Sequence, residues 1–207
     1  MKPALISLSA LSIAALPALA ETKDFPVGSF SNIDVNGGIK VLYETGAETT
    51  VIVEQAEGDF SDISIETDDG ELQIGRESLG FLKSLRANLH VDLVEGDLRV
   101  KVNGKRMPSY TVRVTSPSIS ELDVAQSSIL EASGIDAGKI ELDASSSAKL
   151  IVSGRAASAD MDASSSSSID ASDFIVGAIS IEATSSADVI AHAVTNSRAR
   201  IDASSSS

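Results

Sequence analysis

Residues 140–152 read IELDASSSAKLIV, and this stretch decides the fold. Apolar side chains alternate with polar ones on both sides of a serine run, from Ile140 to Val152. Period two is the pattern of a β-strand with one buried face, whereas a helical stripe has a period of 3.6. We extend the inward alternation through Ser146 and interpret the serines as a bend between two short strands, because small side chains let the backbone turn there.

The same phrase recurs along the chain. Each copy has an acid after an apolar residue, and successive acids are 20, 19, 20 and 20 residues apart. These acids are Asp123, Asp143, Asp162, Glu182 and Asp202. Such a recurrence predicts a solenoid in which each unit contacts only its neighbours. We therefore expect an all-β fold, a right-handed single-stranded β-helix with coils stacked at about 4.7–4.9 Å. Its inward columns are predicted to include Leu130, Leu150, Ile169 and Val189.

Residues 1–20 have the features of a cleaved secretory signal peptide. Lys2 precedes an apolar run from Ala4 to Leu16, and Ala18 and Ala20 are small at the positions that a signal peptidase reads. The run is shorter than the roughly 20 residues that a membrane-spanning helix needs. We predict export to the periplasm, the outer envelope or the extracellular space, with no membrane span after cleavage.

The mature chain divides into two predicted parts. Residues 21–116 form a less regular β region, in which Asp69-Gly70 and Asn103-Gly104 mark tight hairpin turns. The second hairpin is expected to pair Val100 and Val102 with Tyr110, Val112 and Val114. Residues 77–88 offer the one short helix that we predict. Residues 117–207 form the stacked coils, and the last coil is incomplete.

Charge and composition narrow the classes of partner. The formal net charge is −14, and removal of Lys2 with the signal peptide leaves fifteen basic against thirty acidic residues. Nucleic-acid binding depends on Lys and Arg neutralising phosphates, so we exclude it, together with binding to an anionic membrane surface. The chain has no cysteine, which excludes disulfides, thiol catalysis and zinc held by thiolates.

Several stretches together resemble the bacterial DUF2807 family, described as putative auto-transporter adhesin, head GIN domain. They are FSNIDVNGGIKVLYETGAETTVIVE from Phe30, ISIETDDGELQIG from Ile63, YTVRVTSPSISELDVAQSS from Tyr110 and the Asp-Ala-Ser-Ser-Ser coils. The resemblance implies an exported β-solenoid with an adhesin-like role and carries over no catalytic residues. Family coils usually have Ser-Gly-Ser where this chain has Ser-Ser-Ser.

The acids of the repeat are the first candidate site. Stacked one coil apart, Asp123, Asp143, Asp162, Glu182 and Asp202 would repel by roughly 0.9 kcal/mol per neighbouring pair in water. Ca²⁺ prefers carboxylate oxygens and could bridge them. The alternative is a plain solvated acidic face. No other cofactor is expected.

A strip of surface hydroxyls follows the acids and is the second candidate. It comprises Ser145, Ser147, Ser164, Ser166, Thr184 and Ser186. Flat hydroxyl arrays on solenoids can bind ice, but those surfaces generally use threonine, and Thr184 is the one threonine in the strip. We expect the strip to face a ligand or solvent.

One basic cluster interrupts the acidic chain at the Asn103-Gly104 hairpin and includes Lys101, Lys105 and Arg106. It is either a solubilising hairpin tip or a surface that pairs with the acids of another copy. Homo-association could also use the incomplete last coil, because an uncapped coil exposes unpaired strand edges.

These features favour a non-catalytic protein of the envelope or surface that binds a protein or carbohydrate ligand or acts as a scaffold. The alternative is a polysaccharide-processing β-helix enzyme. Glycoside chemistry needs a defined carboxylate pair in a groove, whereas these acids form a repeating column. A unique cleft with acids plus Lys or Arg would favour the enzyme.

Overall fold

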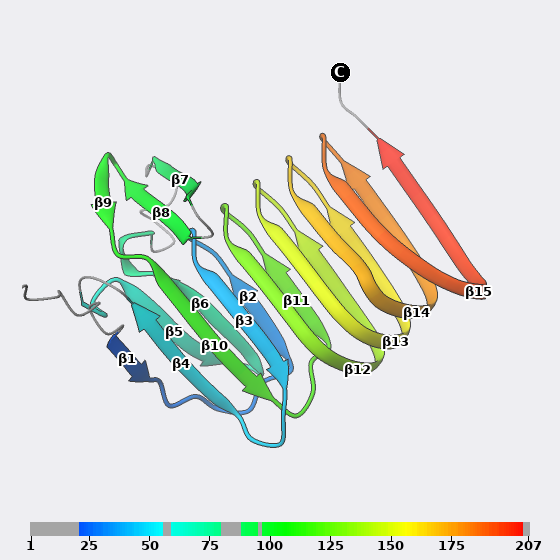
Figure 1. The fold of residues 1–207 in the computed structure, drawn as a ribbon, viewed down its shortest axis with the longest axis horizontal. Helices are drawn as coiled ribbons and strands as arrows, with labels where there is room; N and C mark the ends of the chain where they lie inside the picture. Colours follow the sequence, from blue (N-terminus) through cyan, green and yellow to red (C-terminus); the bar gives the residue numbers. More distant parts are fainter. Residues whose placement is uncertain (1–20, 56–58, 80–87, 95–96, 205–207) are drawn as a thin grey trace, which may run out of the picture.

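The computed structural model describes residues 21–55, 59–79, 88–94 and 97–204, and these are mainly β-strands (Figure 1). The predicted signal peptide, residues 1–20, lies outside the described residues. A 12-stranded sheet and a 3-stranded sheet make up the fold. No helix in the described ranges is long and apolar enough to span a membrane. The all-β fold class is confirmed.

The large sheet contains twelve strands: β1 (Glu21–Asp24), β2 (Asn32–Val35), β3 (Lys40–Thr45), β4 (Thr50–Gln55), β5 (Ile63–Asp68), β6 (Glu71–Arg76), β10 (Tyr110–Ser116), β11 (Glu121–Val124), β12 (Ile129–Ala144), β13 (Lys149–Ala163), β14 (Ser168–Thr184) and β15 (Asp188–Ser204). The small sheet contains β7 (Leu89–Val94), β8 (Asp97–Val102) and β9 (Lys105–Met107). A 3-10 helix, η1, spans Glu77–Leu79. It falls in the predicted helical stretch 77–88, of which residues 80–87 lie outside the described part.

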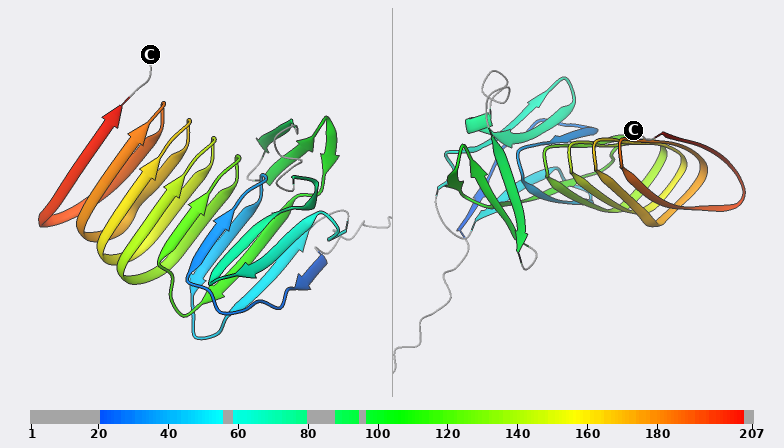
Figure 2. Two further views of the ribbon diagram at one scale, coloured as in Figure 1. Left: turned by 180° about the vertical axis from the view of Figure 1, so that it is seen from behind. Right: turned by 90° about the horizontal axis from the view of Figure 1, so that it is seen from above.

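Each long strand from β12 to β15 has two arms joined by a bend. The first arm of β12 pairs with β3 and its second arm pairs with β11, both in parallel. The first arms thus continue a run through β3, β10, β4 and β1, and the second arms continue a run through β11, β2, β6 and β5. We call these runs the first-arm layer and the second-arm layer. The sheet is therefore curled but open, with the layers facing each other (Figure 2).

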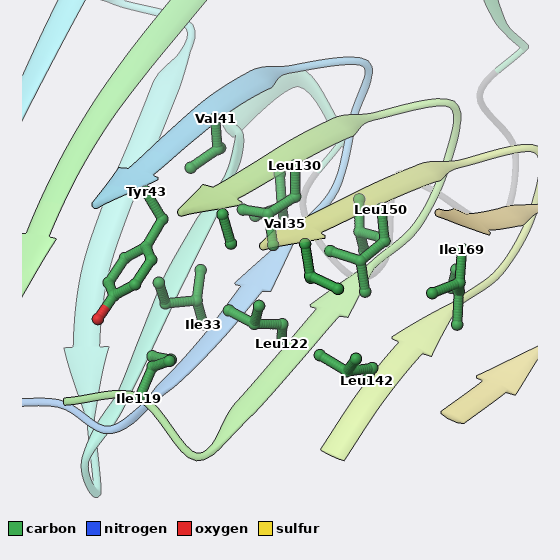
Figure 3. Packing of buried hydrophobic residues seen from close by; sticks show 14 of the residues in the cluster. Ile33, Val35, Val41, Tyr43, Ile119, Leu122, Leu130, Leu142, Leu150 and Ile169 are labelled. Carbon is green, nitrogen blue, oxygen red and sulfur yellow. The ribbon is translucent and has the colours of Figure 1, made fainter. Parts of the chain in front are cut away.

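The predicted stacking of residues about one repeat apart is confirmed. Leu142 aligns with Met161, and Met161 with Ile181. The first-arm column runs through Val41, Leu130, Leu150, Ile169 and Val189. Side chains from both layers meet in one core, in which Leu130 and Leu150 lie across from Leu122 and Leu142 (Figure 3). Most of the core side chains are aliphatic, and Tyr43 and Phe174 are the largest fully buried ones.

The serine bends are tight turns. Their geometry shows that the alternation predicted through Ser146 is wrong. Ser146 and Ser147 have φ of 53° and 64°, and the Ala148 amide donates to the Ser145 carbonyl at 3.0 Å. Positive φ at both central residues makes this a type I′ turn. Ser146 was predicted to face inward and is instead exposed, because the two left-handed residues break the period of two.

The basic hairpin is shorter than predicted. Asn103 and Gly104 do form its turn, but β8 pairs with β9, not with Tyr110–Ser116. The latter segment is β10, which inserts between β3 and β4 in the large sheet. Pro108 explains the break, because proline has no amide hydrogen to extend the ladder. The small sheet packs Leu98, Val100 and Val102 against the main body.

Candidate functional site

The acids of the repeat form a straight column on the outside of the second-arm layer. Asp123 aligns with Asp143, Asp143 with Asp162 and Asp162 with Glu182, and the register continues to Asp202. On the other side, Asp123 aligns with Asp34 of β2. The predicted column is thus present and one acid longer than predicted.

Burial and mutual repulsion change the acidity of this column. The pKa of Asp123 is raised to about 6, chiefly by burial and then by the negative charges of Asp34 and Glu121. The pKa of Asp143 is also raised to about 6, chiefly by burial and then by Asp123 and Asp162. Burial likewise raises the pKa of Asp34. The column is therefore costly to ionise in the folded protein.

Two grooves flank the acid column. One, of about 330 Å³, lies between the column and the serine turns, with Asp143, Asp162, Ser164 and Thr184 in its lining. The other, of about 280 Å³, lies on the opposite side and includes Glu141 in its lining. No group of three or more acids or histidines in the described chain is placed to hold a metal ion. Bridging by Ca²⁺ stays a prediction.

The predicted hydroxyl residues sit on the type I′ turns. Ser147, Ser166 and Ser186 are exposed at the second central position of each turn, while Ser145, Ser164 and Thr184 are half-buried at its start. Consecutive turns are joined by main-chain hydrogen bonds, such as the Ser147 amide donating to the Ser165 carbonyl at 3.0 Å. The hydroxyls thus line an edge of the molecule and not the middle of a flat face.

The basic hairpin lies apart from the acid column. Lys101 aligns with His90 on one side and Arg106 on the other, so Lys101 and Arg106 place two cations side by side on adjacent strands of the small sheet. Lys105 is exposed beside the hairpin turn. The small sheet lies at the end of the molecule opposite β15 (Figure 1). Within one chain the basic cluster therefore does not meet β14 or β15.

The outer edge of β15, the last described strand, is open. Among the described strands β15 pairs only with β14, and Ile190 and Ile201 on it are exposed. Association of copies through this edge stays a prediction.

A third groove was not predicted from the sequence. It has a volume of about 480 Å³ and crosses the outer surface of the first-arm layer over β10, β3, β12, β13 and β14. One aligned row of its lining alternates between charged and aliphatic side chains. The row is Arg113, Leu42, Glu131, Ile151 and Asp170. We call this feature the outer groove.

A β-bulge lies at the β14 end of the outer groove. Ile151 aligns with Asp170 and Ser153 with Asp173, so two residues of β14 oppose one residue of β13. The extra residue turns Asp173 outward, while Phe174 enters the core. Bulges of this kind re-aim side chains and recur beside binding sites. The 19-residue interval from Asp143 to Asp162 belongs to a different register shift, between β12 and β13, so the spacing of the acids did not reveal this bulge.

Specific contacts fix the charged groups of the outer groove. The Arg113 guanidinium donates to Glu54 at 2.6 Å, and Lys40 pairs with Glu131 at 3.0 Å. The Asp170 carboxylate accepts hydrogen bonds from the Ser172 amide at 3.1 Å and the Ser172 hydroxyl at 2.7 Å. These bonds lower the pKa of Asp170, so its carboxylate stays ionised.

Comparisons with known proteins agree with this architecture. A structure named as a putative adhesin, from Bacteroides fragilis, superposes with a TM-score of 0.56 at 11% identity, covering 90% of this chain and 95% of that one. A structure named as a putative lipid-binding protein, from Parabacteroides distasonis, gives a TM-score of 0.50 at 14% identity, covering 90% and 95%. At these identities the likeness concerns the fold alone.

No curated protein matches the sequence. A family model matches residues 29–207, which include every strand described above except β1. The chain therefore belongs to the DUF2807 family, described as putative auto-transporter adhesin, head GIN domain.

Proposed function

We propose that this protein is an exported, non-catalytic binding protein of the bacterial envelope or surface, with an adhesin-like or scaffolding role. We propose further that β12 to β15 act as the coils of a right-handed β-solenoid, which holds the binding surface rigid. The family relationship supports an adhesin-like role. The observation that carries the proposal is the in-register stack, which repeats the same side chains along the molecule beside three outer grooves.

A repeating surface suits a repeating ligand. Neighbouring strands are about 4.7–4.9 Å apart, so each column presents equivalent groups at a constant spacing. Weak contacts to successive units of a polymer add up because later contacts form at a high effective concentration. An envelope polysaccharide is such a polymer, and so we favour it over a compact protein.

The outer groove also bears on the enzyme alternative, since it holds acids together with Arg113. Arg113 is already paired with Glu54 at 2.6 Å. The lowered pKa of Asp170 is the opposite of what a general acid needs. We therefore propose binding without turnover.

Binding and turnover can be measured together. Purified residues 21–207 would be immobilised and exposed to envelope fragments and to a panel of neutral, anionic and cationic polysaccharides. We expect saturable binding to at least one polysaccharide and no increase in reducing ends over hours. An unrelated acidic protein of similar charge controls for simple electrostatics. Absence of saturable binding across the panel would contradict the proposal, and new reducing ends would favour the enzyme.

A further inference from the structure

We propose that the outer groove binds an extended glycan that carries free amino groups, such as a polymer of glucosamine. This inference rests on the proposed binding function and names its ligand class and site. The argument uses the shape of the groove, its hydrogen-bonding character and the arrangement of its aliphatic residues.

The groove is long enough for several units of a polymer. Its lining comes from five adjacent strands, which at about 4.8 Å spacing span roughly 19 Å across the sheet. The volume of about 480 Å³ is within the range of ordinary ligand sites. The Arg113–Glu54 ion pair lies at one end and the β14 bulge at the other. A ligand would therefore lie across the strands.

The groove is rich in acceptors and poor in free donors. Neither Glu44 nor Asp173 forms an ion pair with another described residue, and both are lining residues. The Ser133 hydroxyl donates to the Tyr43 carbonyl at 3.3 Å, and the Ser153 hydroxyl donates to the Ala132 carbonyl at 3.5 Å. Their hydrogens are thus directed to the main chain, which leaves oxygen lone pairs for a ligand.

Lys149 acts electrostatically on Asp170 at the β14 end of the groove. Two further basic groups close to the groove are already engaged in ion pairs. Arg113 pairs with Glu54, and Lys40 pairs with Glu131. An acceptor-rich, negatively charged surface selects a ligand that brings donors and positive charge. Hydroxyl and ammonium groups on one polymer satisfy both requirements, whereas an anionic polysaccharide would be repelled.

The aliphatic residues favour a sugar over a basic peptide. Leu42 and Ile151 lie two strands apart in the same row, with Glu131 between them. Alternating apolar and polar positions suit pyranose rings, which have C–H faces and polar rims. An extended peptide would instead gain most of its affinity by adding to a sheet edge. Here the ligand meets a sheet face, whose main-chain groups are used in the ladder between the strands.

Calorimetric titration of residues 21–207 at mildly acidic pH tests the proposal with four soluble probes. These are the glucosamine hexamer, the N-acetylglucosamine hexamer, cellohexaose and hexalysine. We expect the glucosamine hexamer to bind, and both uncharged glycans to bind at least about tenfold more weakly, since each lost ionic contact is worth around a factor of ten when desolvated.

Matched variants locate the site. The double variant Glu44→Gln/Asp173→Asn should weaken binding of the glucosamine hexamer by about tenfold or more. The control Glu66→Gln/Asp68→Asn makes the same change in charge at exposed positions of β5, outside the three grooves, and should leave affinity within about twofold. Ile151→Ala should weaken binding of the glucosamine hexamer but not that of hexalysine.

The outcomes separate the site, the ligand class and the proposed function. Loss of binding in the control but not in the groove variant would overturn the assignment of the site. Equal binding of hexalysine, insensitive to Ile151→Ala, would overturn the ligand class. If the glucosamine hexamer does not bind while another polysaccharide of the panel does, the inferred ligand class is wrong and the proposed binding function stands. If no polysaccharide binds, both the ligand class and the proposed function are contradicted.

Discussion

The guanidinium of Arg76 donates a hydrogen bond to the Asp62 carboxylate at 2.8 Å, and both side chains are almost fully buried, at 0% and 9% exposure. Arg76 also donates to the Gly37 carbonyl at 2.6 Å and to the Pro108 carbonyl at 2.9 Å. One side chain thus ties the β5–β6 hairpin to the turn between β2 and β3 and to the segment before β10. This buried polar network therefore ties together separate segments of the less regular β region.

Removal of Arg76 should therefore destabilise the fold strongly. Arg76→Ala leaves the Asp62 carboxylate buried and unpaired, and we expect the free energy of unfolding to fall by about 3–5 kcal/mol. Urea denaturation followed by circular dichroism measures this change. Arg155→Ala is a suitable control, because the Arg155–Asp136 pair is exposed and should contribute little. Equal effects of the two substitutions would contradict the structural role of Arg76.

The acid column should make stability depend on pH with a definite sign. Asp123 and Asp143 have folded pKa values raised to about 6, so the folded protein binds protons more tightly than the unfolded chain. This contribution to stability is present at low pH and is lost as the pH rises through about 6. Asp143→Asn should then stabilise the protein at pH 7 by about 1 kcal/mol, after allowance for solvent screening.

The melting temperature of wild type and Asp143→Asn, measured between pH 7 and pH 5, tests the sign. The difference between the two proteins should shrink as the pH falls. Asp136→Asn is the control, and it should lower the melting temperature at pH 7 slightly. The hydrogen bond from Arg155 lowers the pKa of Asp136, so the substitution removes a favourable charge. A lower melting temperature for Asp143→Asn at pH 7 would falsify the account of the column.

The serine turns should accept glycine and reject β-branched residues. Ser146 has a φ of 53°, which costs a side chain energy that glycine avoids. We expect Ser146→Gly to stabilise the protein by about 0.5–1 kcal/mol and Ser146→Val to destabilise it by at least about 1 kcal/mol. Equilibrium urea unfolding gives both values. The same pair of substitutions at the half-buried Ser145, which does not have positive φ, should not show this pattern.

Gly154 should tolerate no side chain. Its φ is 126°, and an added Cβ would collide with the Ile135 main chain of the neighbouring strand β12. We expect Gly154→Ala to cost about 2–4 kcal/mol. Gly138 offers a matched control, because a Cβ there meets nothing within 4 Å and alanine should change stability by less than about 0.5 kcal/mol. A lower melting temperature for Gly138→Ala than for Gly154→Ala would contradict the alignment of Gly154 with Ile135.

The sequence by itself determined the stack. Alternation with a period of two indicated strands with one buried face. The nearly constant spacing of successive acids from Asp123 to Asp202 indicated which residues align. These signals are local or periodic, so a single chain displays them without any knowledge of distant contacts. The columns through Leu142 and Leu150 follow directly.

Only the tertiary structure decided the rest. The outer groove brings Leu42, Arg113 and Glu131 into one row, although they are far apart in sequence and share no motif. The raised pKa of Asp143 depends on burial, and the link from Arg76 to Gly37 depends on how a hairpin docks. The physical reason is that periodic patterns specify which face of a strand is buried, whereas neighbours across strands, bulges and desolvation arise only when the layers pack together.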